Sequence, residues 1–118
     1  MSLADIVAKV NVREKLALFH DHWSPKIVGE LNGQHIKLVK FQGEFVWHKH
    51  DHEDELFLVL KGRFRMEFRD RAIELEEGEF LIVPQGVEHR PVAPWARVAL
   101  AGGIVVDHFR RSSRTSRD

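Results

Sequence analysis

Residues 43–62 read Gly-Glu-Phe-Val-Trp-His-Lys-His-Asp-His-Glu-Asp-Glu-Leu-Phe-Leu-Val-Leu-Lys-Gly, and this stretch decides the fold. Side chains alternate between the two faces of a β-strand, so a strand from Glu44 to His50 places His48 and His50 on one face. Glu55 follows after a short turn at the head of a second strand, within reach of the two imidazoles. The stretch therefore predicts two neighbouring strands that bring three metal-ligating side chains together.

A fourth candidate ligand opens a later strand, after the turn Pro84-Gln85-Gly86-Val87-Glu88-His89. Three neutral imidazoles and one carboxylate leave two positions of a six-coordinate ion open to another molecule. This donor set suits iron, manganese, nickel, cobalt, copper or zinc. We therefore predict one divalent metal ion, held by His48, His50, Glu55 and His89.

Short strands continue on both sides of this stretch. Many short strands with turn residues between them favour a sandwich or barrel. The expected strands span residues 26–30, 34–41, 44–50, 55–60, 63–68, 72–75, 80–83, 89–93 and 97–101. The separating turns contain Asn32-Gly33, Gly62, Arg69-Asp70, Glu77-Gly78, Gln85-Gly86 and Pro94.

Two motifs make the chain resemble a small single-domain cupin. The first, a glycine, His-x-His, a glutamate and a glycine, matches Gly43, His48, His50, Glu55 and Gly62. The second, a glycine, Pro-x-Gly and a histidine, matches Gly78, Pro84, Gly86 and His89. The first motif is one residue short after Gly43, and Ala93 replaces the asparagine that closes the second. The resemblance implies an all-β, double-stranded β-helix (jelly-roll) barrel with these four ligands.

Small cupins with Trp-His-x-His and Asp-Glu-Leu-Phe patterns, as at residues 47–50 and 54–57, are often described as similar to mannose-6-phosphate isomerase. The likeness implies no substrate, because one fold hosts many unrelated functions.

The chain is expected to have three parts. Residues 1–25 carry apolar positions at helical spacing behind the candidate N-caps Ser2 and Asn11, which predicts a short helical segment packing on the barrel. The barrel itself spans residues 26–108. Residues 109–118 are basic and polar with nothing to bury, and are expected to be a disordered tail.

His52 offers a rival to the predicted site. It shares the strand parity of His50, so a site of His50, His52 and Glu55 is an alternative, although the cupin resemblance places His52 in a loop. Three carboxylates nearby are interpreted as solvated: Glu53, Asp54 and Glu88. Four histidines have no partner at ligand spacing and are interpreted as structural or exposed: His20, His22, His35 and His108.

Composition narrows the partners. A chain of 118 residues fits one domain, and its 18 basic and 18 acidic residues cancel, so no electrostatic argument favours nucleic acid or a membrane. The expected partner is a small-molecule ligand or substrate, or a second copy of the chain. There is no cysteine, so a metal must use nitrogen and oxygen ligands. The N-terminal stretch has no uninterrupted apolar run, and a cytoplasmic location is expected.

The predicted interior is largely apolar. If Glu55 points inward, the same parity turns inward Phe57, Val59, Phe64, Met66 and Phe68. Gln42 and Glu44 are the other polar candidates of inward parity before His48, and the chain has no tyrosine or cysteine. A separate general acid or base is thus poorly represented, which favours chemistry carried by the metal.

Two functional hypotheses follow. The first is a small-molecule metalloenzyme, such as a dioxygenase or isomerase, whose substrate chelates the open positions. The second is a non-catalytic binding or sensing module with a structural metal.

A homodimer is also expected. Large apolar patches are uncommon on soluble monomers, so apolar outward residues on two strands predict a cover, either the N-terminal helical segment or a second subunit. The N-terminal segment is short, which favours the second subunit. The outward set is Phe41, Phe45, Trp47, Leu56, Leu58 and Leu60.

Overall fold

Nine strands in the computed structural model, which describes residues 2–94 and the backbone of residues 101–108, pair into two antiparallel sheets. The strands are β1 (Lys26–Leu31), β2 (Gln34–Phe41), β3 (Gly43–Glu44), β4 (Glu55–Lys61), β5 (Arg63–Phe68), β6 (Ala72–Glu76), β7 (Phe80–Val83), β8 (His89–Ala93) and β9 (Ala101–His108). Two short helices precede them, η1 (Leu3–Ile6) and α1 (Val12–Leu16).

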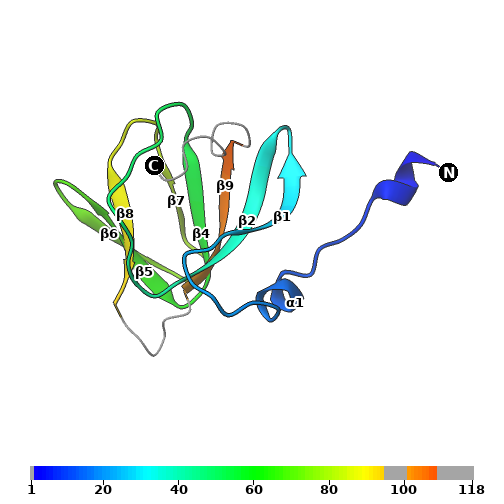
Figure 1. Cartoon of the computed structure of the whole chain (residues 1–118), viewed down its shortest axis with the longest axis horizontal. Coiled ribbons are helices and arrows are strands. Elements are labelled where there is room, and N and C mark those ends of the chain that lie inside the picture. The colour runs from blue at the N-terminus through cyan, green and yellow to red at the C-terminus, as the bar shows by residue number, and fades with distance from the viewer. Residues whose placement is uncertain (1, 95–100, 109–118) are drawn as a thin grey trace.

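The strand order within the sheets is that of a jelly roll. One sheet runs β1-β2-β9-β4-β7 and the other runs β3-β8-β5-β6, so strands far apart in the chain become neighbours. Figure 1 shows the two sheets facing each other, with β5, β6 and β8 opposite β1, β2, β4 and β9. This arrangement confirms the predicted all-β, double-stranded β-helix fold.

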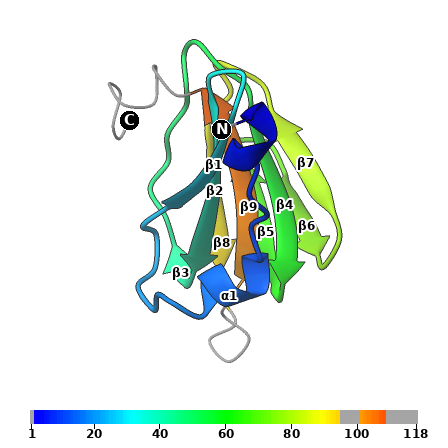
Figure 2. The same ribbon diagram turned by 90° about the vertical axis from the view of Figure 1, so that its right-hand side faces the viewer.

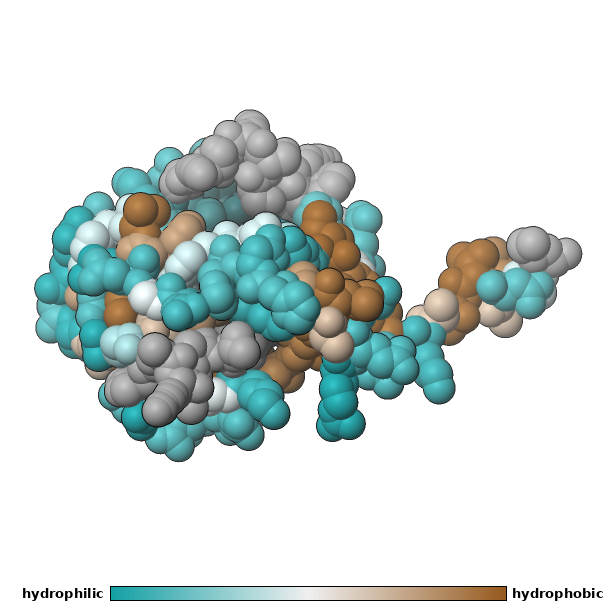
Figure 3. All heavy atoms as spheres, turned by 60° about the horizontal axis from the view of Figure 1, so that its bottom comes forward, coloured by the Kyte–Doolittle hydropathy of each residue, from teal (hydrophilic) through white to brown (hydrophobic). Residues whose placement is uncertain are grey.

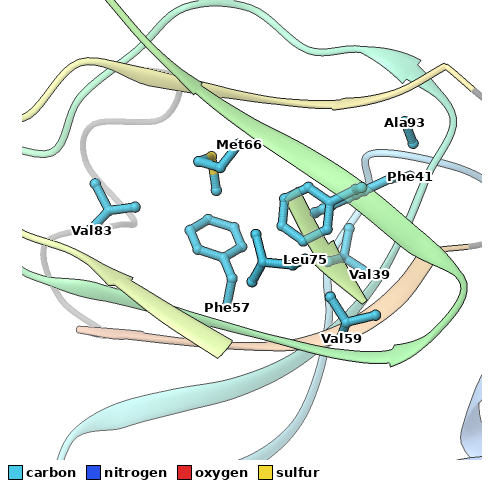
Figure 4. Close-up of a cluster of buried hydrophobic side chains, with 9 residues drawn as sticks. Val39, Phe41, Phe57, Val59, Met66, Leu75, Val83 and Ala93 are labelled. Atoms are coloured by element: carbon cyan, nitrogen blue, oxygen red, sulfur yellow. The ribbon is translucent and has the colours of Figure 1, made fainter. Parts of the chain in front are cut away.

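The core lies between the sheets and follows the predicted parity of β4 and β5. Phe57, Val59, Phe64 and Met66 are buried, while the alternate residues of both strands are at least partly exposed. Figure 4 shows Phe41, Phe57 and Met66 meeting in the space between the two sheets. Burying one such large side chain contributes about 1.5–3 kcal/mol, so this layer supplies much of the driving force for closing the barrel.

The expected strand from Glu44 to His50 is wrong in its length. The chain leaves β2 after Phe41, turns at Gly43 with φ of +79°, and then forms only the two-residue strand β3. Burial alternates from Phe41 to Phe45 and loses this alternation only between Phe45 and His48, so Gln42 and Glu44 are exposed rather than inward.

Three residues that were predicted to lie on the outer surface of the barrel are covered in the structure. Phe41 is buried in the core and stacks on Trp23, as does Phe45, so neither belongs to the outer surface. Trp47 is half-buried beneath the guanidinium groups of Arg69 and Arg90, which lie 3.9 and 5.1 Å from its ring centroid. Of the predicted outward residues, only the leucines of β4 remain on the outer surface: Leu56, Leu58 and Leu60.

The N-terminal segment divides into an exposed arm and an anchored part. Every residue from 2 to 11 is exposed, and Figures 1 and 2 show this arm projecting beyond the five-stranded sheet. Asn11 caps α1 by accepting a hydrogen bond from the Glu14 amide, at 3.0 Å. Lys40 on β2 then anchors the next turn by donating to the Leu16 and Phe19 carbonyls, each at 2.7 Å.

Two predictions concern segments near the C-terminus. The predicted strand at residues 97–101 lies outside the described residues except for Ala101, which begins β9. The predicted disordered tail at residues 109–118 also lies outside them. The last strand extends from Ala101 to His108, beyond the strand that the sequence pattern predicts.

Candidate metal centre

His48 and His50 lie in the segment between β3 and β4, and a backbone bridge fixes the first of them. The His48 amide donates to the His89 carbonyl at 3.0 Å, and the His89 amide donates to the His48 carbonyl at 2.9 Å. His50 is held by its carbonyl, which accepts from the Gly86 amide at 2.7 Å. Main-chain hydrogen bonds therefore join the first motif, which contains His48 and His50, to the second motif, which contains His89.

Glu55 and His89 each begin a strand. Glu55 is the first residue of β4 and is 6% exposed, and His89 is the first residue of β8 and is fully buried. These strands belong to different sheets, so the cluster bridges the two halves of the barrel. One potential ligand atom from each of His48, His50, Glu55 and His89 lies within 4.8 Å of the others.

Hydrogen bonds set the tautomer of two imidazoles. Nδ1 of His48 lies 2.9 Å from the Val46 carbonyl, and Nδ1 of His89 lies 2.9 Å from the Val87 carbonyl. A carbonyl oxygen can only accept, so each Nδ1 carries the hydrogen and a neutral ring keeps its lone pair on Nε2. This is the form in which histidine ligates a metal ion.

The inward atoms of the cluster need a positive charge among them. Glu55 Oε1 lies 3.0 Å from His50 Nε2 and 3.5 Å from His89 Nε2. Within the described part of the chain, the buried Glu55 Oε1 and His89 Nε2 form no hydrogen bond. Lone pairs that face each other at such distances repel, so either protons or a metal cation must lie between them. Three nitrogen donors and one oxygen donor fit a divalent transition metal.

Burial and neighbouring groups shift the pKa values of Glu55 and His48. Burial raises the pKa of Glu55, but the His50 and His89 imidazoles outweigh this and hold it at about 2, so the carboxylate is ionised at neutral pH. Burial also lowers the pKa of His48 below its usual value, which favours the neutral ring. The site is therefore prepared to bind a cation near pH 7.

A pocket of about 90 Å³, partly open to solvent, adjoins the cluster at His48 and Glu55. Its walls are mostly aromatic and aliphatic, and include Trp23, stacked 4.6 Å from Phe41, ring centroid to ring centroid. The Trp23 indole donates to the Gln42 carbonyl at 2.9 Å, and its backbone has a φ of 60°, which is unusual for a residue with a side chain. The place of Trp23 in the pocket could not be predicted from the sequence, because no periodicity links this residue to the barrel strands.

Residues 36–100 match the model of the Cupin domain, which is more than half of the chain. The chain belongs to the cupin family. It is 41% identical to a cupin-2 domain containing protein from Shewanella frigidimarina, a match that covers 84% of this chain and 92% of that one with a TM-score of 0.75.

Two more proteins are similar to this cupin in sequence or in structure. It is 36% identical over 80 residues to YdbB from Bacillus subtilis, covering 67% of this chain and 65% of YdbB, slightly less than two thirds of its length. The structure of KdgF from Halomonas sp. is 24% identical, with a TM-score of 0.66 over 80% of this chain and 90% of that one, and indicates the shared fold alone.

The rival ligand set finds no support in the cupin's geometry. His52 is exposed and lies outside the cluster, whereas His50 lies within it. Of the predicted solvated carboxylates, Glu88 is exposed and pairs with Arg69 at 2.9 Å, but Glu53 is buried, so the prediction for Glu53 is wrong. Three of the other histidines take no part in the cluster: His20 is exposed, and His22 and His35 are half-buried. The side chain of His108 lies outside the part of the chain that the structure describes.

No helix in the part of this cupin that the structure describes is long and apolar enough to cross a membrane.

Metal affinity of this cupin is expected to fall as the pH drops through about 6 to 5, because imidazoles with a reference pKa of about 6.5 must be neutral to ligate. Glu55 does not set this window, since its pKa of about 2 keeps it ionised throughout. Metal content after equilibrium dialysis at a series of pH values measures the effect. Full retention at a pH of about 4.5, well below the imidazole reference value, would contradict a site built mainly from histidine.

Proposed function

We propose that this cupin is a metal-dependent enzyme that binds one divalent ion through His48, His50, Glu55 and His89 and acts on a small anionic molecule. The observation that carries the proposal is the convergence of three imidazoles and one ionised carboxylate beside an apolar pocket. Four donors leave two coordination positions of a six-coordinate ion for a chelating substrate.

The side chains of the pocket suggest how such a substrate would be held. Trp23, Phe41 and Phe45 offer stacked aromatic surface to its apolar part. Lys37 also lines the pocket and is the one lysine or arginine among its described residues, which favours an anionic substrate. A bound ion would supply Lewis acidity and, for a redox-active metal, electron transfer. Glu55 is ionised at neutral pH, so its role is that of a ligand rather than a proton donor.

Elemental analysis of untagged protein tests the metal part of the proposal, and close to one divalent ion per chain is expected. The loaded protein is then incubated in air, with iron(II) among the metals supplied, with aromatic and aliphatic carboxylates that carry a second oxygen donor. Turnover that is lost in His48→Ala supports the enzyme. Saturable binding without turnover under every metal would favour the alternative, a binding or sensing module. The likeness to mannose-6-phosphate isomerase and the cytoplasmic location stay predictions.

We also propose a homodimer formed through the outer face of β4 and β7. Leu56 pairs with Ile82 and Leu58 with Phe80 in register, and the exposed fractions of Phe80 and Ile82 are 60% and 52%. Figure 3 shows apolar surface on the projecting arm as well, where Leu3, Ile6 and Val7 are exposed. A second copy would cover such surface, which soluble monomers rarely expose in large patches.

Light scattering at micromolar concentration is expected to give the mass of a dimer, and the double variant Phe80→Asp with Ile82→Asp is expected to give a monomer. Val46→Asp is the control, because Val46 is similarly exposed, at 59%, but lies away from β4 and β7. A monomer mass for the wild-type protein would end the dimer proposal.

A further inference from the structure

Glu53 is a carboxylate that the barrel buries although it lies in a loop. The residue is 6% exposed, while Asp51, His52 and Asp54 around it are exposed. Burying a charged group is costly unless it is paired. One pairing group is an imidazole, because Glu53 Oε2 lies 3.5 Å from Nδ1 of His50, which is within ion-pair range but longer than a usual hydrogen bond.

The loop holds Glu53 in this inward position through two hydrogen bonds to the second histidine motif. The Gly86 amide donates to the His50 carbonyl at 2.7 Å, and the Gln85 amide donates to the Asp54 carboxylate at 2.9 Å. These bonds fix the loop at His50 and at Asp54, on either side of Glu53. Its orientation is therefore set by the same turn that leads to His89.

The acceptor beside Nδ1 of His50 differs from those beside the other two histidines. Nδ1 of His48 and Nδ1 of His89 each lie 2.9 Å from the carbonyl two residues earlier in the chain. The equivalent carbonyl for His50 belongs to His48, and it accepts the His89 amide at 2.9 Å. Beside Nδ1 of His50 lies a side-chain acceptor, the Glu53 carboxylate, at 3.5 Å.

We propose that Glu53 is a positioning residue of the metal centre: it accepts the Nδ1 hydrogen of His50 and so directs Nε2 of His50 toward Glu55. The inference rests on the proposed metal site. Carboxylates that hold a ligating histidine fix its tautomer, fix the plane of its ring and raise its basicity.

Glu53 also completes the charge of the site. With Glu55 it places two buried carboxylates beside three imidazoles. Two negative charges balance a divalent cation, whereas the cluster of ligands alone would leave one positive charge uncompensated in a buried site. Loss of Glu53 is therefore expected to weaken binding of a divalent ion even though Glu53 is not a ligand.

The test compares cobalt(II) dissociation constants and absorption spectra for Glu53→Leu, Glu53→Gln and Asp51→Asn. Glu53→Leu is expected to weaken cobalt(II) binding by about 10- to 100-fold, the range for loss of a carboxylate behind a ligating histidine. Glu53→Gln should lose less affinity, because its amide oxygen still accepts the Nδ1 hydrogen. Asp51→Asn removes an exposed charge from the same loop and should bind as the wild-type protein does.

Each outcome decides the matter. Unchanged affinity in Glu53→Leu would overturn the inference while leaving the metal site intact. A cobalt(II) spectrum altered in Glu53→Gln as strongly as in Glu55→Gln would make Glu53 a direct ligand and overturn it equally. Failure of the wild-type protein to bind cobalt(II) would refute the proposed function and this inference with it. Thermal unfolding of the metal-free variants separates weaker metal binding from loss of the fold, because a purely structural role would lower that midpoint and leave the affinity unchanged.

Discussion

Replacing His50 with alanine is expected to lower the affinity for a divalent metal by more than about 100-fold, beyond the 10- to 100-fold that loss of an outer partner costs. His50 contributes its Nε2 at 3.0 Å from Glu55, so its removal deletes a donor and leaves the buried carboxylate with less compensation. Competition with a chelator of known affinity measures the change.

His52→Ala is the matched control, because it removes an imidazole two residues away that is exposed and outside the cluster. Its affinity should stay close to that of the wild-type protein. The opposite result, with metal lost in His52→Ala and retained in His50→Ala, would mean that the ligands follow the rival register.

Removing the metal is expected to lower the midpoint of thermal unfolding by about 15 °C. An ion that binds only the folded chain, at 1,000 times its dissociation constant, stabilises it by about 4 kcal/mol, and each kcal/mol shifts a domain of this size by several degrees. The stabilisation should be large here because the four donors come from both sheets.

Differential scanning calorimetry with and without chelator measures this shift. His52→Ala should show the wild-type shift, and His50→Ala should show little response to the chelator. An equal midpoint for metal-loaded and metal-free wild-type protein would contradict an ion that joins the two sheets.

The cluster could be predicted from the sequence because three of its residues are close in the chain and the fourth belongs to the second cupin motif. His48 and His50 are fixed by their separation, Glu55 by its place at the head of β4, and His89 by the turn before β8. The inward parity of β4 was predictable as well, since alternation continues unbroken from Glu55 to Val59.

Other features depend on contacts that no periodicity encodes. Regular strand stops at Glu44, and the alternation that joins Phe41 to Phe45 does not continue to His48, which is why the faces expected for Phe41 and Phe45 were wrong. Glu53 reads as a solvated loop residue until the loop is seen bonded to the turn at Gly86. Tertiary contacts, rather than local propensity, decide both positions.

The paired backbone hydrogen bonds between His48 and His89 link the metal centre to local opening of the barrel. Both amides are donors in one antiparallel bridge, so their hydrogens exchange with solvent only when the two motifs separate. A bound ion that joins the same two residues through their side chains would oppose that separation. Slow deuterium uptake at these two amides would then report, on a timescale of minutes to hours, how rarely the centre opens.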